Sequence, residues 1–131
     1  MVAKNYGVVY TPNRLAEFAA ELLYREAAET NTEIKSVLDP ACGECALLCA
    51  AKKYFNGNVK YLGIDVDKEA IMNVEDDFEI LYNDSILPRN VKKKTAEYWK
   101  SKMPVISAII ANPPWSSETV SYTHLTLPTI A

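Results

Sequence analysis

The segment Asn112-Pro113-Pro114-Trp115 combines side chains suited to hold a flat ring that carries an amine. The carboxamide oxygen of Asn112 accepts hydrogen bonds, and proline fixes φ and lacks an N–H, so the loop presents its carbonyls rigidly. The Trp115 indole offers a large face for stacking. Acceptors directed at an exocyclic NH2 group would prepare that nitrogen to act as a nucleophile. Alternatively, Asn-Pro-Pro only terminates a strand, because X-Pro disfavours helix and Asn favours turns.

Strands are expected to end next to this segment and next to three aspartates. The apolar run 105–111 predicts a central parallel strand that ends at Asn112. Three shorter strands are predicted at 36–38, 61–64 and 80–82, and they are followed by Asp39, Asp65 and Asp84. In an open parallel sheet, ligands bind at the carboxyl ends of the strands. We therefore expect these four polar side chains to lie together.

The aspartates predict a nucleoside site. Asp65 is placed to accept hydrogen bonds from a ribose diol, as an acidic residue after the second strand does in dinucleotide folds. Asp84 is placed to accept from an adenine amino group, Val66 to lie against the adenine face, and Gly43 to allow close approach of the backbone. The alternative for each aspartate alone is a turn or a helix cap.

The loop 39–44 favours a cationic ligand. Gly43 is followed by Glu44, Cys45 and Ala46, so the chain lacks the G-x-G-x-x-G loop that holds a pyrophosphate. Acidic groups favour a positive centre electrostatically. S-adenosylmethionine fits this description, because it joins adenine and ribose to a sulfonium and an amino-acid tail.

Helices are predicted between the strands. Thr11 is expected to be an N-cap with Pro12 at the first helical position. The helix should run to Glu29 with an apolar stripe formed by Leu15, Phe18, Ala19, Leu22 and Leu23. Further helices are predicted at 44–55, 67–75 and 96–102. The alternation predicts an α/β fold with a Rossmann-like, doubly wound parallel sheet, truncated after the fourth strand.

Composition predicts a globular protein with one domain. The chain has 131 residues, of which 49% are hydrophobic and 24% charged. No secretory segment or apolar run of membrane-spanning length is present, so a cytoplasmic location without membrane attachment is expected. We expect residues 1–116 to form the N-terminal part of an S-adenosylmethionine-binding domain. Residues 117–131 form a tail that reads as non-native sequence, and the chain is expected to be an inactive fragment of a longer enzyme.

The cysteines and the charged residues give little indication of function. Cys42 and Cys45 have the C-x2-C spacing of metal or redox sites, but a zinc site needs four ligands and the only histidine is His124. No metal is expected, and Cys45 and Cys49, spaced i, i+4 in a predicted helix, are expected to pack as small apolar groups. The net charge is −3, and the one basic stretch, Arg89 with Lys92 to Lys94, is interpreted as a solvated helix start.

From Tyr10 to Trp115 the chain resembles the N6-adenine DNA methyltransferases of the class I, S-adenosylmethionine-dependent type. Tyr10-Thr11-Pro12 resembles the N-terminal motif of that family, 37–43 its first cofactor loop, 63–67 its acidic motif, and Asn83-Asp84 its adenine-contacting motif. The segment 112–115 resembles the catalytic motif [DNS]-P-P-[YFW]. One departure is Cys45, which replaces the second glycine of the first loop and is expected to narrow the pocket.

The resemblance implies roles for these residues. Cofactor binding falls to Tyr10, Thr11, Pro12, Asp39, Pro40, Ala41, Gly43, Asp65, Val66 and Asp84, and catalysis to Asn112, Pro113, Pro114 and Trp115. The implied reaction moves the methyl group of S-adenosylmethionine directly to N6 of an adenine flipped out of double-stranded DNA. A specificity or restriction subunit is a further implied partner.

Two alternatives remain open. The same Asn-Pro-Pro-aromatic motif serves methyltransferases that act on protein glutamine or on rRNA guanine, whose amines are also conjugated. The third hypothesis is an inactive cofactor-binding fragment.

Overall fold

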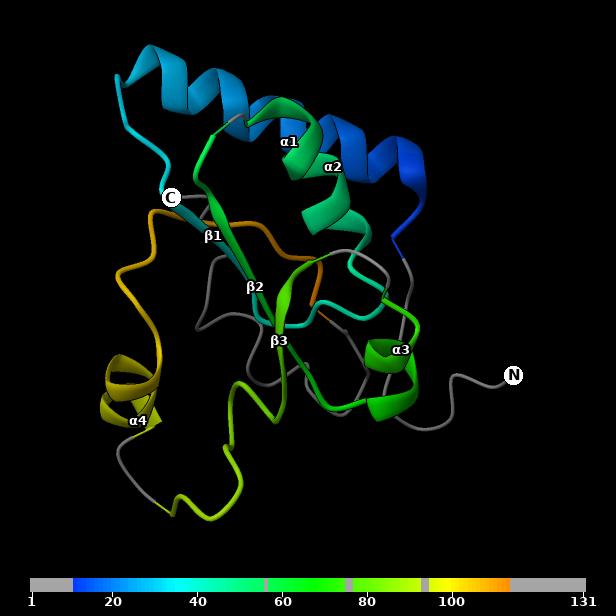
Figure 1. The fold of residues 1–131 in the computed structure, drawn as a ribbon, viewed down its shortest axis with the longest axis vertical. Coiled ribbons are helices and arrows are strands. Elements are labelled where there is room, and N and C mark those ends of the chain that lie inside the picture. Colours follow the sequence, from blue (N-terminus) through cyan, green and yellow to red (C-terminus); the bar gives the residue numbers. More distant parts are fainter. Residues whose placement is uncertain (1–10, 56, 75–76, 93–94, 114–131) are drawn as a thin grey trace, which may run out of the picture.

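The computed structural model describes residues 11–55, 57–74, 77–92 and 95–113. Helices and strands alternate along this part of the chain, as the sequence predicts (Figure 1). In chain order they are α1 (Asn13–Glu29), β1 (Ser36–Asp39), α2 (Ala46–Tyr54), β2 (Lys60–Asp65), α3 (Lys68–Met72), β3 (Glu79–Tyr82), α4 (Thr95–Lys102) and β4 (Ala108–Ile109).

The strands form one parallel sheet in the order β3-β2-β1-β4. From β1 the chain steps outward through β2 to β3, and then crosses back to place β4 on the other side of β1. The switch point therefore lies between β1 and β4. Figure 1 shows α1 and α2 on one side of the strands and α4 on the other. The predicted fold class, a Rossmann-like α/β sheet, is confirmed.

Helix α2 forms the main layer over the sheet. Its buried side chains include Leu48, which is fully buried, as is Val37 of β1 below it. Gly63 in β2 allows the loop after β1 to cross closely, because a Cβ at this position would lie 2.7 Å from the Cys42 Sγ atom. Close packing of Cys42 on Gly63 therefore holds the loop after β1 against β2.

The predicted apolar stripe of α1 is confirmed for Leu23 and wrong for three of its other large members. The buried residues of α1 are Ala16, Ala20, Leu23 and Ala27. Leu15, Phe18 and Leu22 are exposed instead. Helix α1 packs along α2, and the alanines let the two backbones approach closely, so small side chains rather than large ones form the contact.

Strand β4 is shorter than the predicted strand 105–111 and pairs only with β1 among the described residues. Val105 is 91% exposed. The Ser36 hydroxyl donates to the Val105 carbonyl at 2.7 Å, and the same hydroxyl oxygen accepts from the backbone N–H of Ser107 at 3.0 Å. The Ser107 N–H also donates to the Ser36 carbonyl at 3.2 Å, so the side-chain bonds add to a backbone bond at the start of the run. Beyond the strand, the Ile110 N–H still donates to the Leu38 carbonyl at 3.0 Å.

Three helix boundaries also differ from prediction. Helix α1 begins at Asn13, with Pro12 in the N-cap position and without a side-chain cap, so Thr11 is not the N-cap. Helix α2 begins at Ala46 rather than at residue 44, and α3 ends at Met72. No helix within the described ranges is long and apolar enough to cross a membrane.

Candidate cofactor and acceptor site

The carboxyl ends of the four strands bring the predicted polar residues to one edge of the sheet. Asp39 pairs in register with Gly63, two residues before Asp65. Asp65 pairs with Tyr82, and its carbonyl accepts from the Asn83 N–H at 3.0 Å, next to Asp84. Asn112 follows β4 at the same edge. The roles of these residues remain predictions, but their common placement is a property of the fold.

Asp39 is a buried carboxyl group at the end of β1. Its side chain is 1% exposed, and one oxygen accepts from the Ala41 N–H at 3.0 Å. Burial raises the pKa of Asp39 from 3.8 to about 7, against the lowering effect of the Ala41 bond and with a smaller raising effect from the charge of Asp65. A cation placed beside this carboxyl group would favour its ionised form.

Replacing Asp39 by asparagine is expected to stabilise the free protein at alkaline pH. Between the unfolded pKa of 3.8 and the folded pKa of about 7, the native state keeps a proton that the unfolded chain has lost. Stability therefore falls as pH rises through this window and levels off above it. Asparagine carries no charge and can still accept from Ala41. We expect its stability advantage to grow by about 3 kcal/mol from pH 5 to pH 8.

Urea unfolding at pH 5 and pH 8 measures this advantage. The exposed Asp77→Asn serves as a matched control, because it removes a carboxylate without removing a buried one. If the stability advantage of Asp39→Asn is the same at both pH values, burial of the ionised Asp39 carboxylate does not destabilise the fold.

The loop between β1 and α2 is tied to the end of β2. The Cys42 N–H donates to the Ile64 carbonyl at 3.0 Å, and the Gly43 N–H donates to the Asp65 carboxylate at 2.7 Å. Gly43 has φ of 52°, a left-handed conformation that glycine adopts without steric cost. The second Asp65 oxygen accepts from the Asp67 N–H at 2.8 Å. Asp65 therefore orders both loops around the site, which the sequence alone did not reveal.

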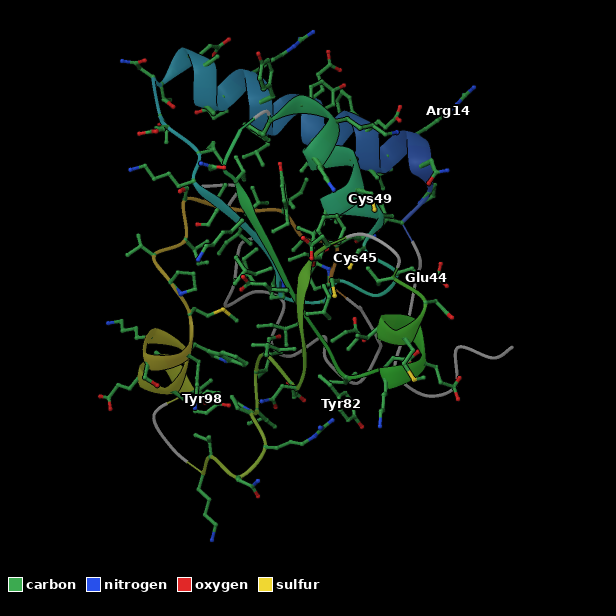
Figure 2. The ribbon with its side chains drawn as sticks, in the orientation of Figure 1. Arg14, Glu44, Cys45, Cys49, Tyr82 and Tyr98 are labelled. Atoms are coloured by element: carbon green, nitrogen blue, oxygen red, sulfur yellow. The ribbon has the colours of Figure 1, made fainter. Side chains whose placement is uncertain are left out.

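Cys45 does not narrow the pocket as expected. Its side chain is fully buried in the core beneath α2, while Glu44 extends into solvent (Figure 2). Its φ of 66° is left-handed, which costs a residue with a Cβ about 1 kcal/mol. A cysteine in place of glycine at position 45 therefore strains the backbone, but its side chain does not enter the site.

Cys45 lies in the core cluster and Cys49 packs against it, as predicted, and Cys42 also lies in the cluster. The hydrogen bond between Cys42 and Cys45, together with burial, raises the pKa of the Cys42 thiol. This thiol therefore stays protonated and is a poor nucleophile.

The loop after β3 is organised by two side chains. One Asp84 oxygen accepts from the N–H groups of Ile86 and Leu87 at 2.8 and 3.0 Å, a turn-forming role that the sequence allowed. The Asn83 oxygen accepts from the N–H groups of Asp84 and Arg89. Asn83 thus fixes the loop that carries Asp84. Its only signal in the sequence is the preference of Asn for turns.

Arg89 does not begin a helix, because α4 starts at Thr95. Its guanidinium lies 3.6 Å from the centre of the ring of Tyr82, the last residue of β3. Arg89 also donates to the Tyr82 carbonyl at 3.2 Å. Lys93 and Lys94 lie outside the described residues.

At the end of β4, the Asn112 side-chain nitrogen donates to the Thr11 hydroxyl oxygen at 3.3 Å. Both residues are half-buried, as is Pro113. This contact joins the two ends of the described chain, and no local pattern in the sequence predicted it. Tyr10, Pro114 and Trp115 lie outside the described residues.

The remaining predicted cofactor residues lie at the same edge. Pro40 and Ala41 are half-buried in the loop after β1, and Val66, after β2, is 36% exposed. Pro12 is exposed at the start of α1. Within the described ranges, no group of three metal-binding side chains is close enough to hold an ion.

A hollow of about 500 Å³ lies at the opposite edge of the sheet. Its lining includes Lys35 and Lys60 at the amino ends of β1 and β2. Ligands of open α/β sheets bind at the carboxyl ends, where the aspartates and Asn112 converge. We therefore assign the site by its chemistry and topology rather than by the volume of this hollow.

Known proteins resemble this chain in sequence and in fold. It is 30% identical over 129 residues to the Type II methyltransferase M.BanIII of Aneurinibacillus aneurinilyticus, a match that spans 86% of this chain but 22% of that protein. The methyltransferase subunit of a type I restriction-modification system from Streptococcus thermophilus superposes with a TM-score of 0.55 and 17% identity, over 87% of this chain and 26% of that one.

The plantazolicin methyltransferase BpumL, in complex with a monoazolic desmethylPZN analog and SAH, superposes with a TM-score of 0.51 and 21% identity, over 70% of this chain and 35% of that one. These structural likenesses show the fold. The profile of the family described as N-6 DNA Methylase matches residues 1–126. Because that match spans nearly the whole sequence, the chain belongs to the N-6 DNA methylase family.

Proposed function

We propose that the enzyme of which this chain is a part transfers a methyl group from S-adenosylmethionine to N6 of adenine in DNA, as the modifying enzyme of a restriction-modification system. The observation that carries the proposal is the convergence of Asp39, Asp65 and Asn112 at one edge of the sheet, beside the switch point. The family match and the curated relative support DNA as the substrate.

The acidic end of the site suits the cofactor. Asp39 is buried with a raised pKa and would gain from a neighbouring cation, which a sulfonium provides. We propose that Asp65 accepts from the ribose hydroxyls through lone pairs not used by the Gly43 and Asp67 N–H groups. Val66 would cover the adenine. When bound, S-adenosylmethionine supplies an electrophilic methyl group.

Other residues complete the proposed cofactor contacts. Asp84 would accept from the adenine amino group through the carboxylate oxygen that does not cap the Ile86 turn. The loop residues Pro40, Ala41 and Gly43 would lie along the cofactor, and Tyr10, Thr11 and Pro12 at its methionine end. The left-handed Gly43 leaves this side of the loop without a Cβ, which permits close approach.

Asn112 and the Pro113 carbonyl would bind the amine of the target base. Their hydrogen bonds would hold the amino lone pair out of conjugation. The nitrogen could then form the new N–C bond as the methyl–sulfur bond of the cofactor breaks, which releases S-adenosylhomocysteine, and it would afterwards lose one proton to water. Pro114 would stiffen the loop and Trp115 would stack on the flipped base. Positioning of the two reactants supplies much of the acceleration.

The proposed partners are double-stranded DNA and a specificity or restriction subunit, and the proposed location is the cytoplasm. The net charge of −3 implies that most phosphate contacts come from residues outside this chain.

The acceptor can be identified with a methyl-labelled cofactor. The full-length enzyme is incubated with labelled S-adenosylmethionine and either double-stranded DNA, ribosomal RNA or a release-factor protein. We expect label in DNA only, recovered as N6-methyladenine after digestion. Label only in RNA guanine or protein glutamine would overturn the proposed substrate.

A further inference from the structure

We propose that Thr11 sets the orientation of the Asn112 carboxamide, so that the oxygen and not the nitrogen of this side chain meets the target amine. This inference rests on the proposed function. It gives the Thr11 hydroxyl a task beyond the cofactor contact implied by the N-terminal motif. Thr11 is a positioning residue in this account, because it acts through Asn112.

The contact joins two segments that the fold brings together from opposite ends. Thr11 immediately precedes α1, and Asn112 follows β4, 101 residues later. Their side chains meet at 3.3 Å, with Nδ2 of Asn112 donating to Oγ1 of Thr11. Each residue is followed by a proline, whose fixed φ limits the movement of the adjoining backbone. The backbone next to each of the two residues is therefore restrained.

A carboxamide needs such a partner because its two ends are alike in size and opposite in chemistry. Rotation by half a turn exchanges the oxygen, an acceptor, with the NH2 group, a donor. If the NH2 group faced the target, two donors would oppose each other and the base would not be held. A hydroxyl that accepts from Nδ2 occupies the donor end, and so it leaves Oδ1 for the substrate.

The substitution Thr11→Val tests this task, because valine has nearly the same shape and cannot accept a hydrogen bond. In the full-length enzyme we expect the single-turnover methylation rate to fall about three- to tenfold, the worth of one neutral hydrogen bond. Because Thr11 is also proposed to lie at the methionine end of the cofactor, the rates are compared at saturating S-adenosylmethionine, so that a loss of cofactor affinity does not enter them. Thr11→Ser keeps the hydroxyl and should restore the rate.

A second background makes the test specific to orientation. Asp is also accepted at the first position of the motif that Asn112-Pro-Pro-Trp resembles, and a carboxylate presents two equivalent acceptor oxygens. In an Asn112→Asp enzyme, orientation no longer matters, so adding Thr11→Val should change the rate less than twofold. The same loss in both backgrounds would overturn the inference.

Two further outcomes separate this inference from the proposed function. Thr32→Val, at the far end of α1, is the matched control and should leave the rate unchanged. If Thr11→Val weakens cofactor binding without slowing the single turnover, Thr11 serves the cofactor alone and the inference fails. If Asn112→Ala retains methylation, the role of Asn112 in the proposed function fails first.

Discussion

Asn112→Ala is expected to abolish methyl transfer while leaving the cofactor site intact. Asn112 supplies the acceptor that holds the target amine in its reactive form, and removal of one such preorganised group lowers turnover by on the order of 10²- to 10³-fold. The Asp39 and Asp65 carboxyl groups accept from backbone N–H groups of the loops after β1 and β2, whereas the Asn112 side chain donates to Thr11, so its removal takes no hydrogen-bond partner from either aspartate. The dissociation constant of S-adenosylmethionine should therefore change less than twofold.

Single-turnover methylation of DNA and calorimetric titration of the cofactor measure the two quantities. Asn58→Ala is the matched control, because Asn58 is exposed and lies at the opposite edge of the sheet. It should retain full activity. An Asn112→Ala enzyme that methylates within tenfold of the native rate would remove this residue from the chemistry.

Asp65→Ala is expected to weaken binding of S-adenosylmethionine on the order of 10²-fold, since hydrogen bonds to a charged group contribute about 1.5–3 kcal/mol each. Part of the loss arises indirectly, because the Gly43 and Asp67 N–H groups lose their acceptor and the two loops lose order. The contribution of the direct contact between Asp65 and the ribose can be measured by changing the ligand instead of the protein.

A cofactor analogue without the ribose 2′-hydroxyl provides that separation. The native enzyme should bind this analogue about tenfold more weakly than S-adenosylmethionine, whereas Asp65→Ala should bind both equally. Asp77→Ala, an exposed carboxylate, serves as the control and should keep the native preference. If native protein and Asp65→Ala discriminate equally between the two ligands, the ribose is not bound by Asp65.

The sequence predicted the order of the elements and the strand ends that carry the site. Both follow from local signals: short apolar runs bounded by Asp, Asn, Gly and Pro mark parallel strands and the turns that follow them. The carboxyl ends of parallel strands lie at one edge of a sheet. The positions of Asp39, Asp65, Asp84 and Asn112 at that edge could therefore be predicted without knowing which contacts they make.

What the sequence did not predict depends on contacts between distant segments. Leu15 and Phe18 are large and apolar, yet the close approach of α1 to α2 selects Ala16 and Ala20 for the buried face. Likewise, the Val105 carbonyl accepts a hydrogen bond from the Ser36 side chain of β1, 69 positions earlier in the chain. Tertiary packing determines these features, and no local pattern in the sequence marks them.

The site itself shows the same division. The loop 39–43 and Asp65 were recognised separately, but the hydrogen bond from the Gly43 N–H to Asp65 joins positions 22 residues apart. The bond between Thr11 and Asn112 spans 101 residues. Cys45 is visible as a replaced glycine, whereas the burial of its side chain depends on the core beneath α2.

In the proposed enzyme, a sulfonium nucleoside and a conjugated amine meet where the parallel strands end. A crystal structure of the full-length enzyme with S-adenosylhomocysteine would locate the cofactor half of this site. We expect ribose hydroxyls on the Asp65 carboxylate, adenine against Val66, and the sulfur atom on the side of Asn112. A ligand bound at the amino ends of the strands, or one that leaves Asp65 and Asn112 without contact, would refute the proposed site.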